Sequence, residues 1–201
     1  MVIVGVAGAI GAIALYVCTA MVYACLPFLR EWASPLTIAN FTLLGSASGF
    51  TLAAAFAAFA AQDAARLLTG TAFVLTLAGG ATRVASLVRN ARLRPKSTLQ
   101  TAIGVKHPRI VQKSMGFMGG SFNTREFFHG RSRSALRSVR GVFLVLAFVI
   151  PALLFIAVRS GFPSWWLVVA FVVQFLGLVA ERWYFFAEAN HPQNLYYQAI
   201  A

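Results

Sequence analysis

The sequence predicts an all-α fold, a polytopic integral membrane helix bundle with five transmembrane helices. Of its 201 residues, 59% are hydrophobic and 11% are charged, and the mean hydropathy is +0.75. These values lie far outside the usual balance of a soluble domain. Five apolar stretches are long enough to cross a hydrocarbon core of ~30 Å, which takes about 20 helical residues. Because lipid offers the backbone no hydrogen-bond partner, each stretch must satisfy its own groups as a helix.

The five expected helices belong to a single membrane domain, residues 1–201. The first begins directly after Met1, without a basic segment or a small-residue cleavage site, so it is not a secretory signal peptide. A chain that begins inside a bilayer-length helix is typical of a truncated product, although a helix at an N-terminus is also ordinary. The expected transmembrane helices are 2–26, 36–61, 67–88, 142–158 and 165–187.

Small residues and one proline give the expected helices their packing features. Gly45 and Gly49 form a GxxxG pattern in the second helix, which favours close helix contact. Pro151 is expected to kink the fourth helix, because it cannot donate the helical hydrogen bond. The first helix carries a similar series of small residues at Gly5, Gly8 and Gly11.

The sequence predicts no redox cofactor bound by this chain. Cys18 and Cys25 lie two turns apart on one expected helix, roughly 10 Å by helical rise, and cannot bond to each other. Iron–sulfur clusters and structural zinc sites typically take four ligands. A transmembrane haem needs axial histidines inside the helices, and His107, His129 and His191 all lie outside the expected spans. We therefore expect no haem, no iron–sulfur cluster and no metal site.

The basic residues gather in one long loop, residues 89–140. This loop holds twelve of the seventeen Lys and Arg residues, whereas the two short connections on the opposite side hold one each. The positive-inside rule then places the loop and the C-terminus in the cytoplasm and the N-terminus of this chain outside. A basic patch next to the membrane is explained by anionic lipid headgroups or an acidic partner, so nucleic-acid binding is not expected.

The middle of the basic loop is expected to be folded. Asn123 and Glu126 have the spacing of a helix N-cap and its capping-box partner, with Phe127 and Phe128 on a short helix that Gly130 ends. Two interpretations of the loop stay open. It is either a docking surface for a cytoplasmic protein or a segment that lies in the membrane interface.

Three ionisable residues lie within the expected spans: Arg83, Glu181 and Arg182. A charge at the bilayer centre costs on the order of 2.5 to 3.5 kcal/mol on insertion scales, and less where the side chain reaches the interface. Glu181 is expected near the inner interface, beside the aromatic pair Trp183 and Tyr184. The three residues are therefore either interfacial anchors or the lining of a polar pocket in which a carboxylate exchanges protons.

Three longer stretches carry a likeness beyond composition. Together they resemble the membrane anchor subunits of the dimethyl sulfoxide reductase family of molybdoenzymes, including those of sulfite-oxidising relatives. The stretches are HPRIVQKSMGFMGGSFNTREFFHG at 107–130, ERWYFFAEANHPQNLYYQ at 181–198, and CTAMVYACLPFLREWASPLTIANFTLLGSASGFTLAAA at 18–55.

The resemblance implies a non-catalytic anchor in a bacterial inner membrane. It implies two partners, an iron–sulfur electron-transfer subunit and a molybdopterin catalytic subunit. It also implies electron exchange between the quinone pool, menaquinone or ubiquinone, and a small sulfur compound of the dimethyl sulfoxide or sulfite type, in anaerobic or sulfur respiration. Family anchors are eight-helix proteins, so three helices are expected to be missing before Met1, together with most of the family's quinone contacts.

Since the chain is expected to hold no redox centre, quinone chemistry must occur close to a partner's cluster at the inner face. No catalytic residue is expected in the chain itself. The quinone-pocket candidates are Arg83, His107, Glu181, Arg182 and His191. The candidates for partner docking are Arg109, Lys113, Arg125, Glu126, Arg131 and Arg133.

Two other functions stay open at the level of sequence. The chain is alternatively a polytopic transporter or channel component in which the basic loop regulates, although broken helices in two related halves are not evident. It is otherwise a non-functional fragment, an interpretation that follows from the expected truncation.

Overall fold

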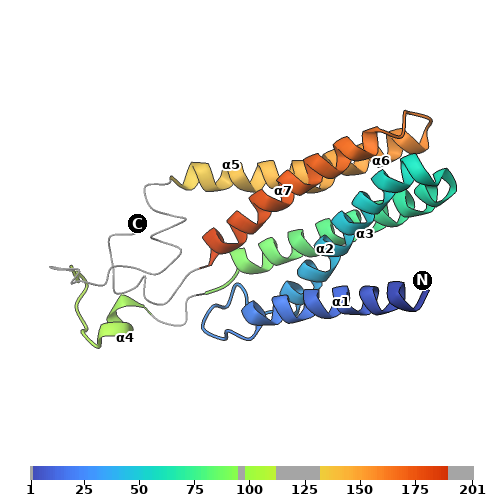
Figure 1. Cartoon of the computed structure of the whole chain (residues 1–201). Helices are drawn as coiled ribbons and strands as arrows, with labels where there is room; N and C mark the ends of the chain where they lie inside the picture. Colours follow the sequence, from blue (N-terminus) through green and yellow to red (C-terminus); the bar gives the residue numbers. More distant parts are fainter. Residues whose placement is uncertain (1, 95–97, 112–131, 190–201) are drawn as a thin grey trace, which may run out of the picture.

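The structure is a computed structural model that describes residues 2–94, 98–111 and 132–189, and these residues form helices and their connections without any strand (Figure 1). Within them, five helices are long and apolar enough to cross a membrane, the fourth being the continuous span Ser134–Arg159. The all-helical membrane fold is therefore confirmed. The elements are α1 Val2–Ala24, α2 Pro35–Ala60, α3 Gln62–Ala91, α4 Leu99–Ile103, α5 Arg133–Leu144, η2 Val145–Val149, α6 Ile150–Arg159 and α7 Trp166–Glu188.

The long helices alternate in direction, so the bundle has two distinct ends (Figure 1). At the end that we call the loop end, α1, α3 and α7 finish, α2 and α5 begin, and α4 lies beyond the bundle. At the opposite end, the short-connection end, α2 passes directly to α3, and α6 reaches α7 through residues 160–165. Both α3 and α5 extend as helix into the range 89–140 that the sequence assigns to the basic loop.

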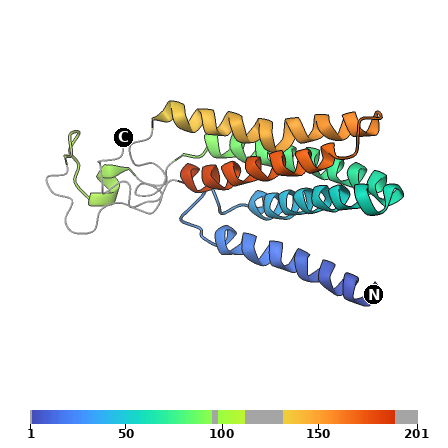
Figure 2. The same ribbon diagram turned by 45° about the horizontal axis from the view of Figure 1, so that its top comes forward.

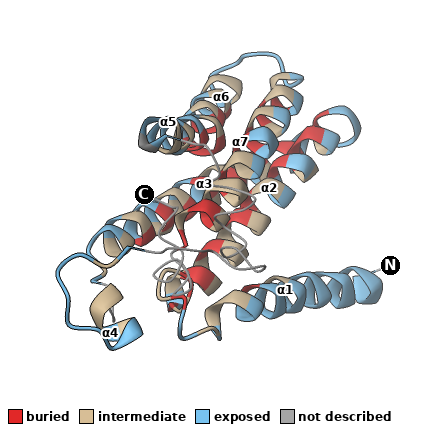
Figure 3. Cartoon of the chain, turned by 90° about the vertical axis from the view of Figure 1, so that its left-hand side faces the viewer, coloured by how far each residue is buried: buried red, intermediate tan, exposed pale blue. Residues whose placement is uncertain are grey.

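Four of the spans share an interior, and α1 lies at its margin. Buried residues of α2, α3 and α7 and of the α5–η2–α6 span face one another, whereas α1 is exposed along most of its length (Figure 3). Helix α1 packs on α2 near the loop end and diverges from the bundle toward its first residue (Figure 2). Ala20 is the buried residue that α1 contributes.

The small residues of the first two helices have different surroundings. A Cβ atom at Gly45 would lie 2.7 Å from Cε1 of Tyr16, so this glycine lets the Tyr16 ring of α1 reach the backbone of α2. Within the described chain, nothing lies within 4 Å of a Cβ atom at Gly5, Gly8 or Gly11. The GxxxG glycine therefore receives a ring rather than a second helix backbone, and the α1 glycines face away from the bundle.

A π-helical turn, η2, precedes Pro151, and at this turn the fourth span packs against α7. Proline has no N–H to donate to the carbonyl four residues earlier, which belongs to Ala147. That carbonyl accepts instead from Nε2 of Gln174 in α7, at 3.4 Å. A Cβ atom at Gly177 would lie 2.4 Å from the Ala147 backbone nitrogen, so glycine is required for the two helices to approach this closely.

Candidate functional site

Four charged side chains meet inside the bundle at the loop end, and we call Arg83, Glu181, Arg182 and Glu188 the charged cluster. Oε1 of Glu181 lies 2.7 Å from Nε of Arg83, on α3, and Oε2 lies 2.6 Å from Nη2 of Arg182. Nη2 of Arg83 lies 3.6 Å from Oε2 of Glu188, which is nearer the end of α7. With two cations and two carboxylates the cluster is formally neutral, which limits the cost of burying it in lipid.

The burial of these groups bears on their interpretation as interfacial anchors. The Glu181 side chain is 0% exposed and that of Arg83 is 2% exposed, whereas Arg182 is 31% exposed. Arg83 and Glu181 therefore do not extend out of the protein as interfacial anchors would. The structure brings together the three intramembrane candidates, Arg83, Glu181 and Arg182, as one bridged group.

Aromatic rings surround the two arginines. The guanidinium of Arg182 lies 4.1 Å from the ring centre of Phe41 and 4.8 Å from that of Phe185. The guanidinium of Arg83 lies 5.5 Å from the ring centre of Phe143 on α5. Such contacts stabilise a cation most where water is excluded, so the rings contribute to holding both arginines inside the bundle.

An aromatic cluster closes the loop end beside the charges. The Trp32 ring stacks on Phe185 at 5.1 Å, and Tyr23 of α1 packs edge-on against both rings. Nε1 of Trp32 donates to the carbonyl of Phe185 at 3.0 Å. Carbonyls in the last turn of a helix have no partner within that helix, so the indole caps the end of α7. The connection between α1 and α2 is thereby fixed over the charged cluster.

Several buried polar atoms of this region have no hydrogen-bond partner within the described residues. They include Nη1 of Arg182, Oε1 of Glu181, whose contact with Arg83 lacks hydrogen-bond geometry, and Oδ1 of Asn40. The amide of Asn40 donates its Nδ2 hydrogen to Ser86 at 2.8 Å. Unpaired polar atoms are rare in protein interiors and call for an explanation. In this cluster, the unpaired Nη1 donor of Arg182 lies next to the Glu181 carboxylate, which both arginines hold as ion pairs.

The histidine and docking candidates lie elsewhere or outside the described residues. His107 is exposed beyond α4, and its Nδ1 accepts from the backbone N–H of Arg109 at 3.0 Å, a contact within its own loop. Arg109 is also exposed, and the side chain of Arg133, the first residue of α5, is not described. The candidates outside the described residues are Lys113, Arg125, Glu126, Arg131 and His191, together with the expected helix at 123–130.

Three polar residues of this region were missed at the level of sequence. Glu188 lies at the end of the last span, where a charge is ordinary, and only the fold shows that it faces Arg83. Asn40 and Ser86 were missed because small polar residues are common in membrane helices. Glu188 lies seven residues after Glu181, which puts it two helical turns away on the same face. This spacing is the sequence signal that could have pointed to Glu188.

Five membrane spans around an internal ion-pair cluster define a polytopic membrane protein. Among the described residues, no group of three or more His, Cys, Asp or Glu side chains is placed to hold a metal ion. The family model described as the DMSO reductase anchor subunit (DmsC) matches residues 1–197. The chain belongs to this family of membrane anchor subunits.

A curated relative supports this membership. This relative, a sulfite dehydrogenase subunit from Allochromatium vinosum, is 56% identical over 203 aligned residues, which cover 99% of the present chain. The chain spans 61% of the length of that relative. No solved structure is significantly similar to the chain.

Proposed function

We propose that this chain anchors a molybdopterin and iron–sulfur oxidoreductase complex at the membrane, with its loop end toward the cytoplasm and against the iron–sulfur subunit. Membership of the DmsC family supports the anchoring role, and the 56% identical sulfite dehydrogenase subunit favours sulfite as the sulfur compound. The concentration of basic residues at the loop end supports the orientation. The complex then transfers electrons between that compound and the quinone pool.

The observation that carries the proposal is the unpartnered donor of Arg182 beside the buried Glu181 carboxylate. A quinone needs a hydrogen-bond donor at its carbonyl oxygen and a group that accepts or returns a proton. Among the described residues, Nη1 of Arg182 is a buried donor without a hydrogen-bond partner, and the adjoining Glu181 carboxylate is held by ion pairs to Arg83 and Arg182. The residues present therefore fit the headgroup, and their position at the loop end is close to where a partner's cluster would lie.

The roles of the chain's own residues follow from this placement. A bound quinone supplies the two-electron, two-proton chemistry. Arg182 donates through Nη1 and orients the headgroup, while the Glu181 carboxylate is the group that takes up or releases a proton. Arg83 holds the Glu181 carboxylate in place from α3, at 2.7 Å, and the aromatic cluster excludes water from the loop end. Arg83 is a positioning residue in this arrangement.

Docking to the iron–sulfur subunit is assigned to the basic loop. The proposed contacts are His107, whose ring is held by a contact within its own loop, and charged residues of the range 89–140. His191 is a further candidate for the quinone pocket. Exposed arginines and lysines next to the membrane steer an acidic partner surface and set its register. The charged docking residues proposed are Arg109, Lys113, Arg125, Glu126, Arg131 and Arg133.

The experiment that tests the quinone site uses Arg182→Gln in the complete complex with its iron–sulfur and molybdopterin subunits. This change removes the free donor yet leaves Glu181 paired with Arg83, so it avoids unpairing a fully buried charge. We expect the KM for quinone to rise about tenfold, the equivalent of one charged hydrogen bond. Turnover measured with a soluble electron carrier at the molybdopterin subunit should not change.

The matched control is Arg92→Gln, which removes one exposed charge at the loop end of α3. It should leave the KM for quinone within twofold of the parent complex. An unchanged quinone KM in Arg182→Gln, at equal content of assembled complex, would contradict a quinone site at the charged cluster.

The transporter alternative has less support. In the middle of the bundle, the amide of Gln174 accepts from the hydroxyl of Thr51 at 2.7 Å and donates to that of Thr76 at 3.0 Å. All three are buried, and Gln174 also binds the Ala147 carbonyl. Side chains satisfied by one another connect helices rather than present sites for a transported solute.

A further inference from the structure

A groove opens on the outer surface of the bundle at the short-connection end, far from the charged cluster along the helices. It lies between α3 and α6 and encloses about 870 Å³, within the range of ~300 to 1,000 Å³ typical of ligand sites. Its apolar walls are strongly exposed, with Leu67 at 73% and Val74 at 63% of their surface free. In a membrane this part of the groove faces lipid tails.

Two arginines form the polar rim of the groove. Arg66 on α3 and Arg159 at the end of α6 line the groove and also line an adjoining polar cavity of about 360 Å³. Nη1 of Arg159 lies 3.5 Å from the Arg66 carbonyl and 3.4 Å from where a Cβ atom of Gly70 would be. Gly70 therefore lets the guanidinium lie across α3, next to the first turns of that helix.

This pair of cations has no anionic partner in the part of the chain that the structure describes. No carboxylate there lies within 4 Å of either guanidinium, although Asp63 lines the same polar cavity. Two like charges that line one groove repel each other, and an anion bound in the groove would relieve this repulsion. Arginine is also the side chain that best matches phosphate oxygens, through two parallel hydrogen bonds.

The depth of the two arginines suits a lipid headgroup. Trp165 and Trp166 stack at 4.6 Å at the beginning of α7, at the same end of the bundle. Tryptophans gather at the boundary between hydrocarbon and headgroups, so this pair marks the level of the interface. Arg66 lies in the second turn of α3 and Arg159 ends α6, so both stand at this end of the bundle, and the apolar wall continues along α3 from Leu67 to Val74.

We propose that this groove binds one anionic phospholipid, with its phosphate between Arg66 and Arg159 and an acyl chain along Leu67, Val74 and Ile156. The charge of the rim and the apolar length of the groove select an anionic amphiphile, and the surrounding leaflet supplies it. The bound lipid would fill the gap between α3 and α6 and hold the short-connection end together. The proposal concerns the opposite end from the quinone site and does not depend on it.

The test measures lipid retention by the full chain with native mass spectrometry in detergent. Phosphatidylglycerol is the anionic probe and phosphatidylcholine the zwitterionic one. We expect a single phosphatidylglycerol to be retained, with a Kd at least tenfold lower than that of phosphatidylcholine. The double variant Arg66→Gln/Arg159→Gln should raise the Kd for phosphatidylglycerol at least tenfold, and Arg92→Gln, at the loop end, should change it less than twofold.

A second variant keeps the charges and blocks the groove. Gly70→Leu places a side chain where the Arg159 guanidinium and the lipid meet, and it should also weaken retention, with the helical circular dichroism unchanged. Equal retention of both lipids, or unaltered phosphatidylglycerol binding in the double arginine variant, would overturn the proposal. Displacement of the lipid by a quinone that binds the double variant equally well would overturn it too, because the groove would then recognise a neutral headgroup.

Discussion

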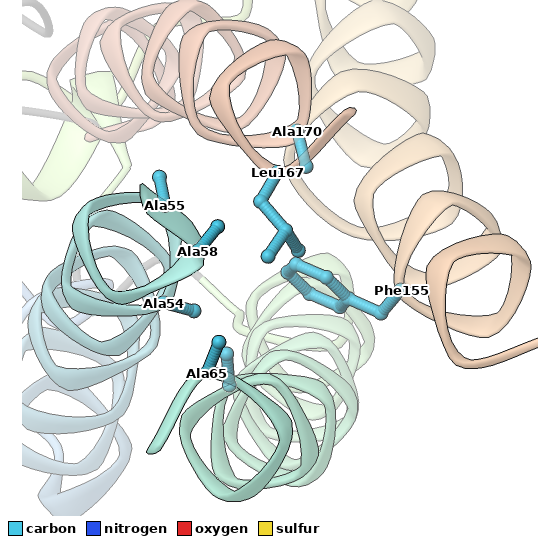
Figure 4. Close-up of a cluster of buried hydrophobic side chains, with 8 residues drawn as sticks. Ala54, Ala55, Ala58, Ala65, Phe155, Leu167 and Ala170 are labelled. Atoms are coloured by element: carbon cyan, nitrogen blue, oxygen red, sulfur yellow. The ribbon is translucent and has the colours of Figure 1, made fainter. Parts of the chain in front are cut away.

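The two ends of the bundle are held together in different ways. At the loop end, Glu181 bridges two arginines and aromatic rings close around them. At the short-connection end, the interior consists of small alanines around Phe155 and Leu167 (Figure 4). Buried ionisable groups are costly in a membrane and are retained where they have a role, so this difference supports the proposal of a functional site at the loop end.

The contrast follows from the forces available in lipid. Lipid tails are as apolar as leucine, so apolar side chains gain little by leaving them, and close packing of small residues holds helices together. Alanines such as Ala54, Ala58 and Ala65 provide that packing in the short-connection end. They carry no ionisable group, whereas the charged cluster combines ion pairs between helices with a donor, Nη1 of Arg182, that has no hydrogen-bond partner among the described residues.

The largest expected effect comes from removing the bridging carboxylate at the loop end. Glu181→Leu leaves Arg83 buried without its nearest partner, and breaking a buried pair in this way costs about 3 to 5 kcal/mol. We expect the free energy of unfolding, measured by denaturation with sodium dodecyl sulfate in mixed micelles, to fall by that amount. The double variant Arg83→Met/Glu181→Leu should recover only part of the loss, because Arg83 is no longer buried unpaired whereas Arg182 still loses Glu181 and Glu188 loses Arg83.

A smaller effect is expected between the two ends, where α7 touches the π-helical turn. Gly177→Ala places a Cβ atom 2.4 Å from the Ala147 backbone nitrogen, and only a shift of α7 can relieve this contact. Overpacking of this kind costs about 1 to 3 kcal/mol. Gly8→Ala, in α1, is the matched control and should change the unfolding free energy by less than about 0.5 kcal/mol, because its Cβ meets nothing in the described chain. Equal losses in the two variants would mean that the close approach of α7 and η2 is not required.

The smallest effect is expected from the hydrogen-bonded residues in the middle of the bundle. Gln174→Leu removes bonds to Thr51 and Thr76. Such interhelical bonds are worth on average about 0.6 kcal/mol in membranes, because the unfolded helices also find partners. We expect a loss of that size in the same assay. A loss as large as that of Glu181→Leu would show that the midplane, rather than the loop end, holds the fold.

The sequence was sufficient for the fold and for part of the site. Hydropathy and length define membrane helices directly, and Arg83, Glu181 and Arg182 stood out because charges are rare in such segments. The ion pair between Arg83 and Glu181 could not be predicted from the sequence, because the two residues are far apart in the chain and composition does not fix the register of two helices. For the same reason the insertion of Tyr16 against Gly45 was missed, since a GxxxG pattern does not reveal which group fills it.

The central claim is that the loop end meets the redox partner, and cross-linking from both ends tests it most directly. A photoreactive phenylalanine analogue would replace Thr98, exposed beyond the loop end, or Phe162, exposed at the short-connection end. We expect irradiation of the intact complex to cross-link the iron–sulfur subunit from position 98 and not from position 162. Capture from position 162 alone would contradict it.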